Sequence, residues 1–452
     1  MSAPTAEIPR LRRVLTLWDL IFYGIVAVTP SAPATVYGLA EVKSGGYVVV
    51  TILAAMVAMV LTAVSYGRMA ALYPSAGSAY TYVSRGIHPY LGFVAGWAML
   101  LDYMLIPLFC TLYGTLSLQR ALPGLPFVIG AVFFSGGITI LNLRGIRSTA
   151  LANQALLVFM GIVLLSFIVL AIRYIAIRHG VLGLFSIEPF YRPGTFHVRA
   201  IASATSFAAL TYLGFDAVTT MAEDVKNPRR NVLLAAVSTC LFTGVFGGLL
   251  VYLAHLAWPN YSTFTNVDTA FIDVTGRVGG VALLKATALL LVVANVGAGL
   301  TSQVGAARLL FGMARENVIP ARFFARLHPT RNTPDINIIL LGVIGFIGAQ
   351  VISYELAAEL LNFGAFLGFM GVNLAVIWKF WFQGADARGR NFLLDFGVPA
   401  LGFLFCTVIW IGLGNPAKIA GCLWLVAGFF VLANHTGWFR RPIVMTDPSA
   451  YE

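Results

Sequence analysis

The chain has 452 residues, of which 59% are hydrophobic and only 10% are charged, and its formal net charge is +11. Soluble domains carry about 25% charged residues, so this composition excludes an ordinary soluble protein and indicates a polytopic α-helical membrane protein. The Lys and Arg residues stand mostly in short loops between apolar runs, which is the distribution that sets membrane topology and argues against a nucleic-acid partner.

The apolar runs predict twelve transmembrane helices, because each approaches or exceeds the length that crosses a bilayer. Their expected positions are 15–38, 47–66, 90–118, 127–141, 149–172, 201–231, 232–258, 281–313, 336–352, 356–381, 392–413 and 417–435. Twelve spans put both termini on one side, and the loops on that side hold about twice as many Lys and Arg residues. We therefore expect a multi-pass cell-membrane protein with cytoplasmic tails at 1–14 and 436–452, and no removed signal peptide.

The first span is interrupted at its middle by two prolines, in the sequence Val28-Thr29-Pro30-Ser31-Ala32-Pro33. Each proline lacks a backbone donor and obstructs the preceding turn. Freed backbone groups in lipid need partners, so a break here belongs against protein or a water-filled cavity. A broken, site-lining helix and a simple proline kink both fit this pattern.

The third span contains Asp102-Tyr103 in its middle. A carboxylate inside a membrane span is costly and is rarely left facing lipid. Asp102 could be the counter-charge of a cationic substrate or a proton carrier, or it could pair with arginine or polar groups near a gate. Tyr103 could meet an ammonium group by cation–π contact, or it could be a packing aromatic.

The sixth span carries Gly214 and Asp216 where hydrocarbon is expected, and it ends in the basic tail 226–230. Glycine loosens the helix where backbone groups could turn toward a ligand. Asp216 could bind and release a proton during transport, or it could cap the second half-helix. The residues beside the break could line a substrate pocket or pack the helix; they are Phe207, Leu210, Tyr212 and Leu213.

Two later spans carry candidate gating residues, Ser302 in the eighth and Phe366 in the tenth. Thr301 and Ser302 could line a cation site, or they could hold helices together. Asp273 is expected in a polar loop before the eighth span. All four cysteines fall in apolar segments and are expected to be buried, and the histidines show no metal-site spacing, so we predict no metal and no cofactor.

The two weakened spans, the first and the sixth, are five spans apart and therefore cross the membrane in opposite directions. Interrupted helices at corresponding positions of two halves are typical of an inverted-repeat transporter. We therefore predict a first repeat at 15–172, an extracellular connection at 173–199, a second repeat at 200–381 and two further helices at 392–435.

Several motifs now agree in order and spacing with one family. Gly214-Phe215-Asp216, followed by 223–228 (EDVKNP), resembles the sixth-helix signature of the amino acid–polyamine–organocation permeases. Residues 73–82 (YPSAGSAYTY), Arg308 with 313–320 (MARENVIP), and Thr333-Pro334 agree with it, and the resemblance covers about residues 15–435. Leu101-Asp102-Tyr103 is similar to the putrescine-importer branch, in which the matching tyrosine is implicated in substrate recognition.

The resemblance implies a five-plus-five inverted-repeat fold with discontinuous helices 1 and 6 and peripheral helices 11 and 12. It implies that Leu210 lines the pocket, that Asp216 senses protons, and that the first break binds a substrate carboxylate through backbone N–H groups. Here the break, Thr29-Pro30-Ser31-Ala32, contains no glycine, and Pro30 removes one donor. This departure favours an amine without an α-carboxylate. Met160 stands where some relatives carry a lysine in place of sodium.

We predict a secondary-active transporter of amino acids or small amines, including polyamines, that works by alternating access and is coupled to proton import. An exchanger is the alternative. A channel would need a continuous polar pore, whereas Asp102 and Asp216 are isolated. An enzyme would need a catalytic cluster in the membrane, and no such motif is present.

Overall fold

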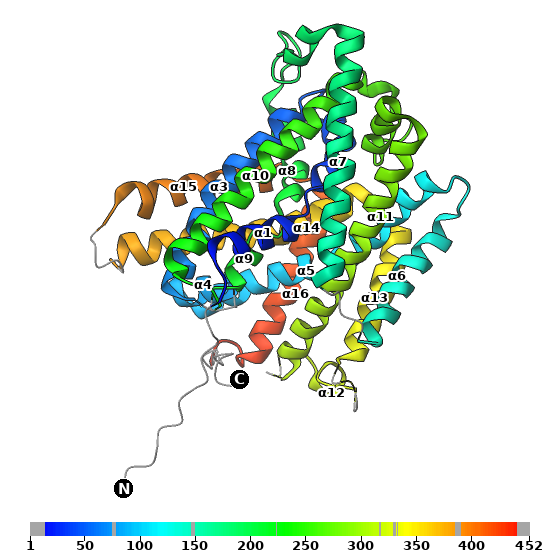
Figure 1. Cartoon of the computed structure of the whole chain (residues 1–452). Helices are drawn as coiled ribbons and strands as arrows, with labels where there is room; N and C mark the ends of the chain where they lie inside the picture. The colour runs from blue at the N-terminus through cyan, green and yellow to red at the C-terminus, as the bar shows by residue number, and fades with distance from the viewer. Residues whose placement is uncertain are drawn as a thin grey trace.

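The computed structural model is a bundle of helices and describes residues 14–74, 78–145, 150–222, 224–315, 318–328, 331, 333–384 and 390–440. Figure 1 shows most of the helices running roughly along the bundle, with α15 and the chain around it projecting to one side. The regular structure of the described residues is helical, apart from one isolated parallel backbone bridge between Leu15 and Val225.

The first half of the chain forms helices that include both elements of the broken first span. They are α1 (Leu17–Val28), α2 (Ala32–Ser44), α3 (Val48–Leu72), α4 (Ser78–Gly86), α5 (Pro89–Ala121), α6 (Phe127–Leu143), α7 (Ala150–His179), η1 (Val181–Phe185), α8 (Val198–Ala208), η2 (Ala209–Tyr212) and α9 (Ala217–Thr220).

The second half continues with longer helices and two π-helical turns. They are α10 (Pro228–Ala257), η3 (Tyr261–Thr263), α11 (Ala270–Arg315), α12 (Ala321–Phe324), α13 (Asp335–Val351), α14 (Tyr354–Val376), η4 (Ile377–Phe382), η5 (Leu393–Gly397), α15 (Val398–Ile411) and α16 (Asn415–His435).

The described residues contain nine helices that are long and apolar enough to cross a membrane. The pair α1 and α2 passes the same test as one span, bent by 46° at its break, and α6 and α13 are shorter apolar helices. The prediction of an all-helical, multi-pass membrane protein with an interrupted first span is therefore confirmed.

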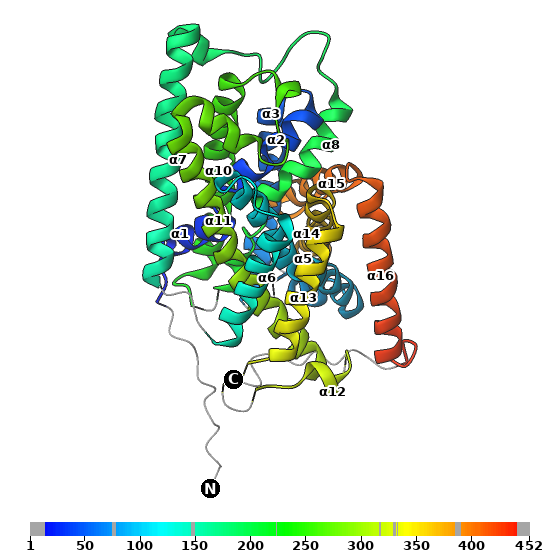
Figure 2. The ribbon, with the colours of Figure 1, turned by 90° about the vertical axis from the view of Figure 1, so that its right-hand side faces the viewer.

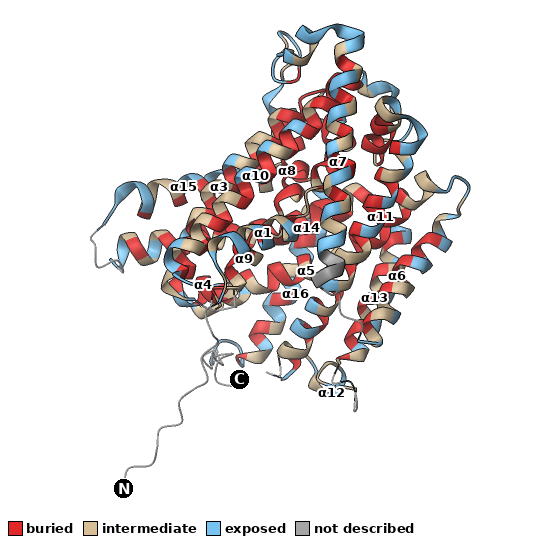
Figure 3. Cartoon of the chain, viewed as in Figure 1, coloured by how far each residue is buried: buried red, intermediate tan, exposed pale blue. Residues whose placement is uncertain are grey.

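The interior of the bundle is built around α5 and α14, which pack against each other, and α5 also packs along α11. Figure 2 places α7 and α16 on opposite edges of the bundle. Figure 3 shows buried residues concentrated on the central helices, whereas α7 carries exposed positions along its length. Apolar residues exposed on a peripheral helix of a membrane protein are the expected lipid-facing surface.

Several predicted boundaries are wrong. The seventh span begins at Pro228 and not at 232, because proline at the first turn starts a helix as readily as it stops one. The helix expected at 281–313 begins at Ala270 and is broken at Gly280 (φ +69°). Asp273 therefore lies in a helix and not in a loop. Cys422 was expected to be buried and is exposed on α16.

Candidate functional site at two broken helices

The first break uses a strained residue and leaves few free backbone donors. Thr29 ends α1 with a positive φ of 67°, and its N–H donates to the Ile25 carbonyl. The Ala32 N–H donates to Thr29 (2.9 Å) and the Ala34 N–H to Ser31 (3.0 Å), while Pro33 has no N–H. The buried Ser31 therefore holds the one N–H in this turn that makes no backbone hydrogen bond.

The second break follows α8 and η2, where Leu213 turns to an extended conformation and Gly214 adopts φ +102°. A Cβ at Gly214 would lie 2.9 Å from the Ala27 carbonyl oxygen. Glycine is required here both by the positive φ and by this close approach. The two breaks predicted separately therefore lie against each other in the folded chain.

Two carboxylates lie beside the breaks and are almost fully buried, with 7% of Asp102 and 6% of Asp216 exposed. Asp102 comes from α5, and Asp216 directly precedes α9. The negative charge of Asp216 acts on the Asp102 carboxyl group, so the two acids repel each other when both are ionised. The Oδ1 atom of Asp102 has no hydrogen-bond partner.

Asp216 occupies the N-cap position of α9, but its side chain makes no capping hydrogen bond. Its main-chain carbonyl is engaged instead, accepting from the Thr219 N–H at 2.9 Å and from the Thr219 hydroxyl at 2.7 Å. The side chain therefore lacks the contact that a purely structural cap requires.

Several tyrosines lie near Asp216. Tyr66, Tyr82 and Tyr103 all interact electrostatically with its carboxylate. The ring of Tyr66 packs edge-on against Phe215 (5.5 Å) and Tyr82 (5.8 Å). Of these tyrosines, sequence reasoning assigned a role only to Tyr103. A lone tyrosine in an apolar helix carries no periodic or charge signal that distinguishes a site residue from packing.

At the end of the site formed by α2 and α8, Phe207 packs against Tyr354 with ring centroids 5.7 Å apart. Lys43 lies over the Phe207 ring at 5.8 Å. Its ammonium group pairs with Glu355 (2.5 Å) and with Glu359 (2.8 Å), of which Glu359 is only 3% exposed. These contacts close this end with charge and aromatic packing.

A further buried contact joins Glu41 of the same helix α2 to the imidazole of His255 on α10. Both side chains are fully buried, and the His255 Nε2 has no partner. Neither residue was singled out from the sequence, because the first span was predicted to end at residue 38, whereas α2 continues to Ser44. If the first span had been predicted to extend to residue 44, Glu41 would have been recognised as an acid inside the membrane.

Some of the remaining predicted residues lie beside the second break, and others pack or anchor the helices around it. Leu210 and Leu213 are half-buried beside the second break. The Tyr212 hydroxyl donates to the Ile52 carbonyl (2.8 Å) and anchors η2 on α3. Phe366 packs against Phe369 (5.6 Å), which in turn contacts Phe215.

Ser302 donates its hydroxyl to Ala298 (2.7 Å) on its own helix, and the exposed Thr301 also bonds its own helix. Asn362 of α14 donates to the Ser206 carbonyl of α8 (2.7 Å), and its Oδ1 has no partner. Met160 is buried.

The described residues hold no group of three potential metal ligands. Residues 75–77, 223 and 316–317 of the motifs, and the terminal tails 1–13 and 441–452, lie outside the described residues.

A family model described as "Amino acid permease" matches residues 34–429. The chain is 30% identical over 448 residues to the low-affinity putrescine importer PlaP of Escherichia coli, covering 97% of both chains. It is 25% identical to the branched-chain amino acid permease BcaP of Bacillus subtilis, over 95% of this chain and 94% of that one. It is 28% identical to the methylthioribose transporter of Bacillus subtilis, over 81% of each. These proteins are transporters and not enzymes.

Proposed function

The chain belongs to the amino acid permease family, and on that premise we propose that it is a secondary-active transporter that imports a small primary amine, such as putrescine, together with protons. The relative that is 30% identical over nearly the whole chain is named as a putrescine importer. The permease named for branched-chain amino acids is 25% identical, so an amino acid is the competing substrate class.

The observation that carries the proposal is the pair of buried carboxylates at the joined breaks. Burying a carboxylate is costly, and Asp102, whose Oδ1 has no hydrogen-bond partner, is acted on by a second acid, Asp216. A diamine brings two ammonium groups, whereas protons bring one positive charge each. A substrate ammonium group at Asp102 and a proton on Asp216 would together neutralise the pair, so that the amine and the proton move in the same direction.

The first break favours an amine over an α-amino acid. Binding a carboxylate at a helix N-terminus needs several free N–H groups. In α2 the Ala32 and Ala34 donors are used internally and Pro33 has none, which leaves Ser31. The substrate ammonium is instead held by Asp102, by a tyrosine ring and by backbone carbonyls at the second break. In this proposal Thr29, Pro30, Ser31, Ala32, Tyr103, Phe207, Leu210, Leu213 and Gly214 line the site, and Tyr212 supports it.

The same proposal includes the topology. The nine apolar helices, the bent pair α1–α2, and the shorter helices α6 and α13 together supply twelve spans. We assign 15–172 and 200–381 to two inverted repeats, with 392–435 peripheral and both termini cytoplasmic. The end of the site formed by α2 and α8 then faces outward, and the end formed by α1 and α9 faces the cytoplasm, with Phe366 and Ser302 as candidate gating residues.

Uptake of radiolabelled putrescine into proteoliposomes tests the proposal. Asp102→Asn keeps the shape of the side chain and removes its charge, and it is expected to lower kcat/KM for putrescine by about 10–100-fold, the value of one charged hydrogen bond. Glu188→Gln, on the exposed surface, is the matched control. Saturable uptake of leucine with no binding of putrescine would replace the amine with an amino acid as substrate.

Proton coupling is tested in the same vesicles with the membrane potential clamped. An inward proton gradient is expected to accelerate putrescine uptake, and Asp216→Asn is expected to abolish that acceleration. Uptake that ignores the gradient but requires putrescine inside the vesicles would identify an exchanger.

A further inference from the structure

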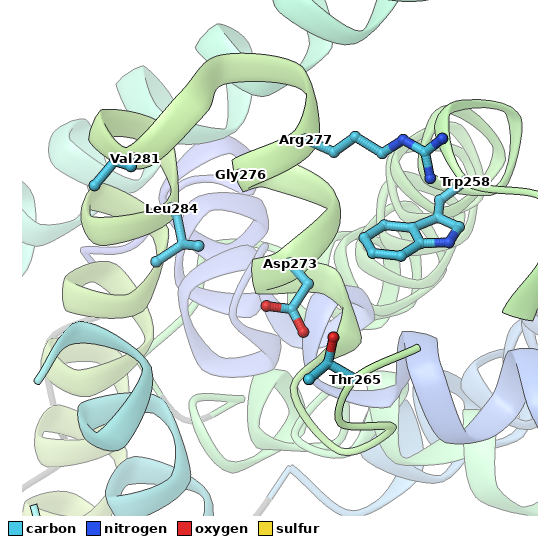
Figure 4. A pocket seen from close by; sticks show the side chains of 7 residues that line it. All are labelled: Trp258, Thr265, Asp273, Gly276, Arg277, Val281 and Leu284. Atoms are coloured by element: carbon cyan, nitrogen blue, oxygen red, sulfur yellow. The ribbon is translucent and has the colours of Figure 1, made fainter. Parts of the chain in front are cut away.

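A cavity lies at the end of the bundle where α10 finishes and α11 begins. Its volume is about 400 Å³, and its lining residues are Trp258, Thr265, Asp273, Gly276, Arg277, Val281 and Leu284. The helix α11 supplies both walls, because its backbone breaks at Gly280 and separates a short arm from the long membrane helix. Figure 4 shows the two arms of α11: one carries Val281 and Leu284, and the other carries Asp273 and Arg277, with Trp258 beside Arg277.

Asp273 lines this cavity and carries a carboxylate oxygen that no donor in the described chain satisfies. The residue is 8% exposed, and its Oδ1 forms an ion pair with Arg120 at the end of α5. Its Oδ2 is buried and has no hydrogen-bond partner. In Figure 4 the Asp273 carboxylate points toward Thr265. A buried acceptor of this kind is costly unless a donor reaches it.

Arg277 stands one helical turn beyond Asp273 and supplies the opposite charge. Its Nε donates to the Tyr174 hydroxyl (3.0 Å), and its guanidinium lies over the Trp258 ring at 4.7 Å. The side chain is exposed, and its other nitrogens make no hydrogen bond within the described residues. Residues four apart share a helix face with Cβ atoms about 5–6 Å apart, so one small ligand can contact both.

The charges around the cavity select the ligand. Arg120 already balances Asp273, and Arg277 adds a further positive charge, so a bare cation would be repelled and a bare anion would leave Asp273 Oδ2 unsatisfied. We propose that this cavity binds a zwitterion whose primary ammonium group donates to Asp273 and whose anionic group is held by Arg277. This inference does not depend on the proposed transport function.

Two sources supply that chemistry, namely the headgroup of phosphatidylethanolamine and a free amino acid. The wall formed by Val281 and Leu284 is apolar, and Val281 is exposed at the edge of the bundle, so a lipid chain could continue along it. A quaternary ammonium lacks the N–H that Asp273 Oδ2 needs. Phosphatidylcholine, which has the same phosphate, is therefore a matched negative control.

The test measures the thermal stability of the purified full-length protein in nanodiscs of phosphatidylethanolamine and of phosphatidylcholine. A ligand that binds the folded state raises the midpoint of unfolding. We expect phosphatidylethanolamine to raise it by about 2–5 °C over phosphatidylcholine. Alanine added to the phosphatidylcholine nanodiscs is the arm for a free zwitterion.

Three variants remove the site by different means. Asp273→Asn removes the acceptor charge, Arg277→Gln removes the anion contact, and Thr265→Phe fills the cavity from an exposed position without changing charge. Lys285→Gln and Glu188→Gln are exposed matched controls for the two charge changes. Because Asp273→Asn also disturbs the Arg120 ion pair and could impair folding, the other two variants carry the test if it does.

A phosphatidylethanolamine shift that disappears in the variants and persists in the controls supports the lipid headgroup. An alanine shift with the same pattern supports a free amino acid. A shift of equal size in the variants and the wild type would overturn the proposal, as would the absence of a shift with both ligands in the wild type.

Discussion

At the end of the central site formed by α2 and α8, the closing contacts combine ion pairs with aromatic packing, whereas at the end formed by α1 and α9 they are aromatic contacts and main-chain hydrogen bonds. Lys43 with Glu355 and Glu359 closes the first end. At the second end, Phe369 packs against Tyr66 and Phe215, and Leu15 exchanges hydrogen bonds with Asp224 (3.0 Å) and Lys226 (2.9 Å).

The difference predicts how each end opens. Charged groups that separate can be hydrated by water and screened by salt, so an ion-pair closure is reversible and sensitive to its surroundings. Aromatic groups that separate expose apolar area, which is unfavourable by roughly 25 cal/mol per Å². We therefore expect the α2–α8 end to respond to salt, and the α1–α9 end to open only when the broken helices themselves move.

Gly214→Ala should have the largest effect, because it affects the junction that the two ends share. The new Cβ would meet the Ala27 carbonyl at a positive φ, and such strain costs about 1–3 kcal/mol. We expect a lower unfolding temperature and at least a tenfold loss of putrescine uptake. At Gly248 an added Cβ makes only ordinary contact with Leu53 (3.5 Å), so Gly248→Ala should retain uptake. Equal uptake and equal unfolding temperatures in the two variants would show that the close approach of Gly214 to Ala27 is not required.

Lys43→Met should open the ion-pair end selectively. It leaves the buried Glu359 without its cation, at a cost of about 1–3 kcal/mol. A cysteine introduced at Ser31, in a background with the native cysteines replaced, should then react about tenfold faster with a membrane-impermeant maleimide, the factor that corresponds to roughly 1.4 kcal/mol. Lys285→Met, an exposed change on α11, should leave the rate unchanged. High salt should mimic Lys43→Met, and an unchanged rate in both cases would contradict a charge-based closure.

Leu15→Pro should weaken the opposite end by a smaller amount. Proline removes the N–H that donates to Asp224, and one such hydrogen bond contributes about 0.5–1.5 kcal/mol. Hydrogen exchange at the Lys226 amide, which donates to Leu15, should become faster, whereas Leu15→Ala keeps the donor and should not accelerate it. Added salt should not alter the difference between the two variants. A salt-dependent difference would mean that this end, too, is closed by charge.

Asp268→Asn should have the smallest effect and should vary with pH. Burial, and then the charge of Glu355, raise the pKa of Asp268 above its ordinary value of 3.8. The folded state therefore binds this proton more tightly than the unfolded state, and stability falls as pH rises from about 4 through the raised pKa. Melting curves should show the variant matching the wild type at acid pH and exceeding it slightly at neutral pH. The gain is about 0.5 kcal/mol, because Asp268 is only half-buried and water screens it. The opposite sign would contradict a raised pKa for Asp268.

The breaks could be predicted from the sequence because proline and glycine act on the backbone directly. Pro30 and Pro33 lack donors, and Gly214 permits a positive φ, so these positions are informative without any knowledge of their neighbours. Asp102 and Asp216 were found for a similar reason, since a charge inside an apolar span is conspicuous.

The contacts around those residues could not be predicted, because they depend on which helices meet. Tyr66 and Tyr82 gain their meaning only when α3 and α4 lie beside Asp216. Asp273 looks like a loop residue in sequence, yet it is helical and is paired with Arg120 from a distant part of the chain. The same limit applies to Lys43 and Glu359, which are 316 residues apart.

The broken sixth span also affects how the protein is made. Among the nine apolar helices described, Val198–Thr220 is the least apolar, whereas the preceding Gln154–His179 is the most apolar. A segment this polar is poorly retained in lipid by itself, and α8 packs against α2, α3, α14 and α15, the last two of which are synthesised long after it. We therefore expect the sixth span to become stably inserted only when the C-terminal helices arrive, so that the centre of the permease would be completed at the end of its biogenesis.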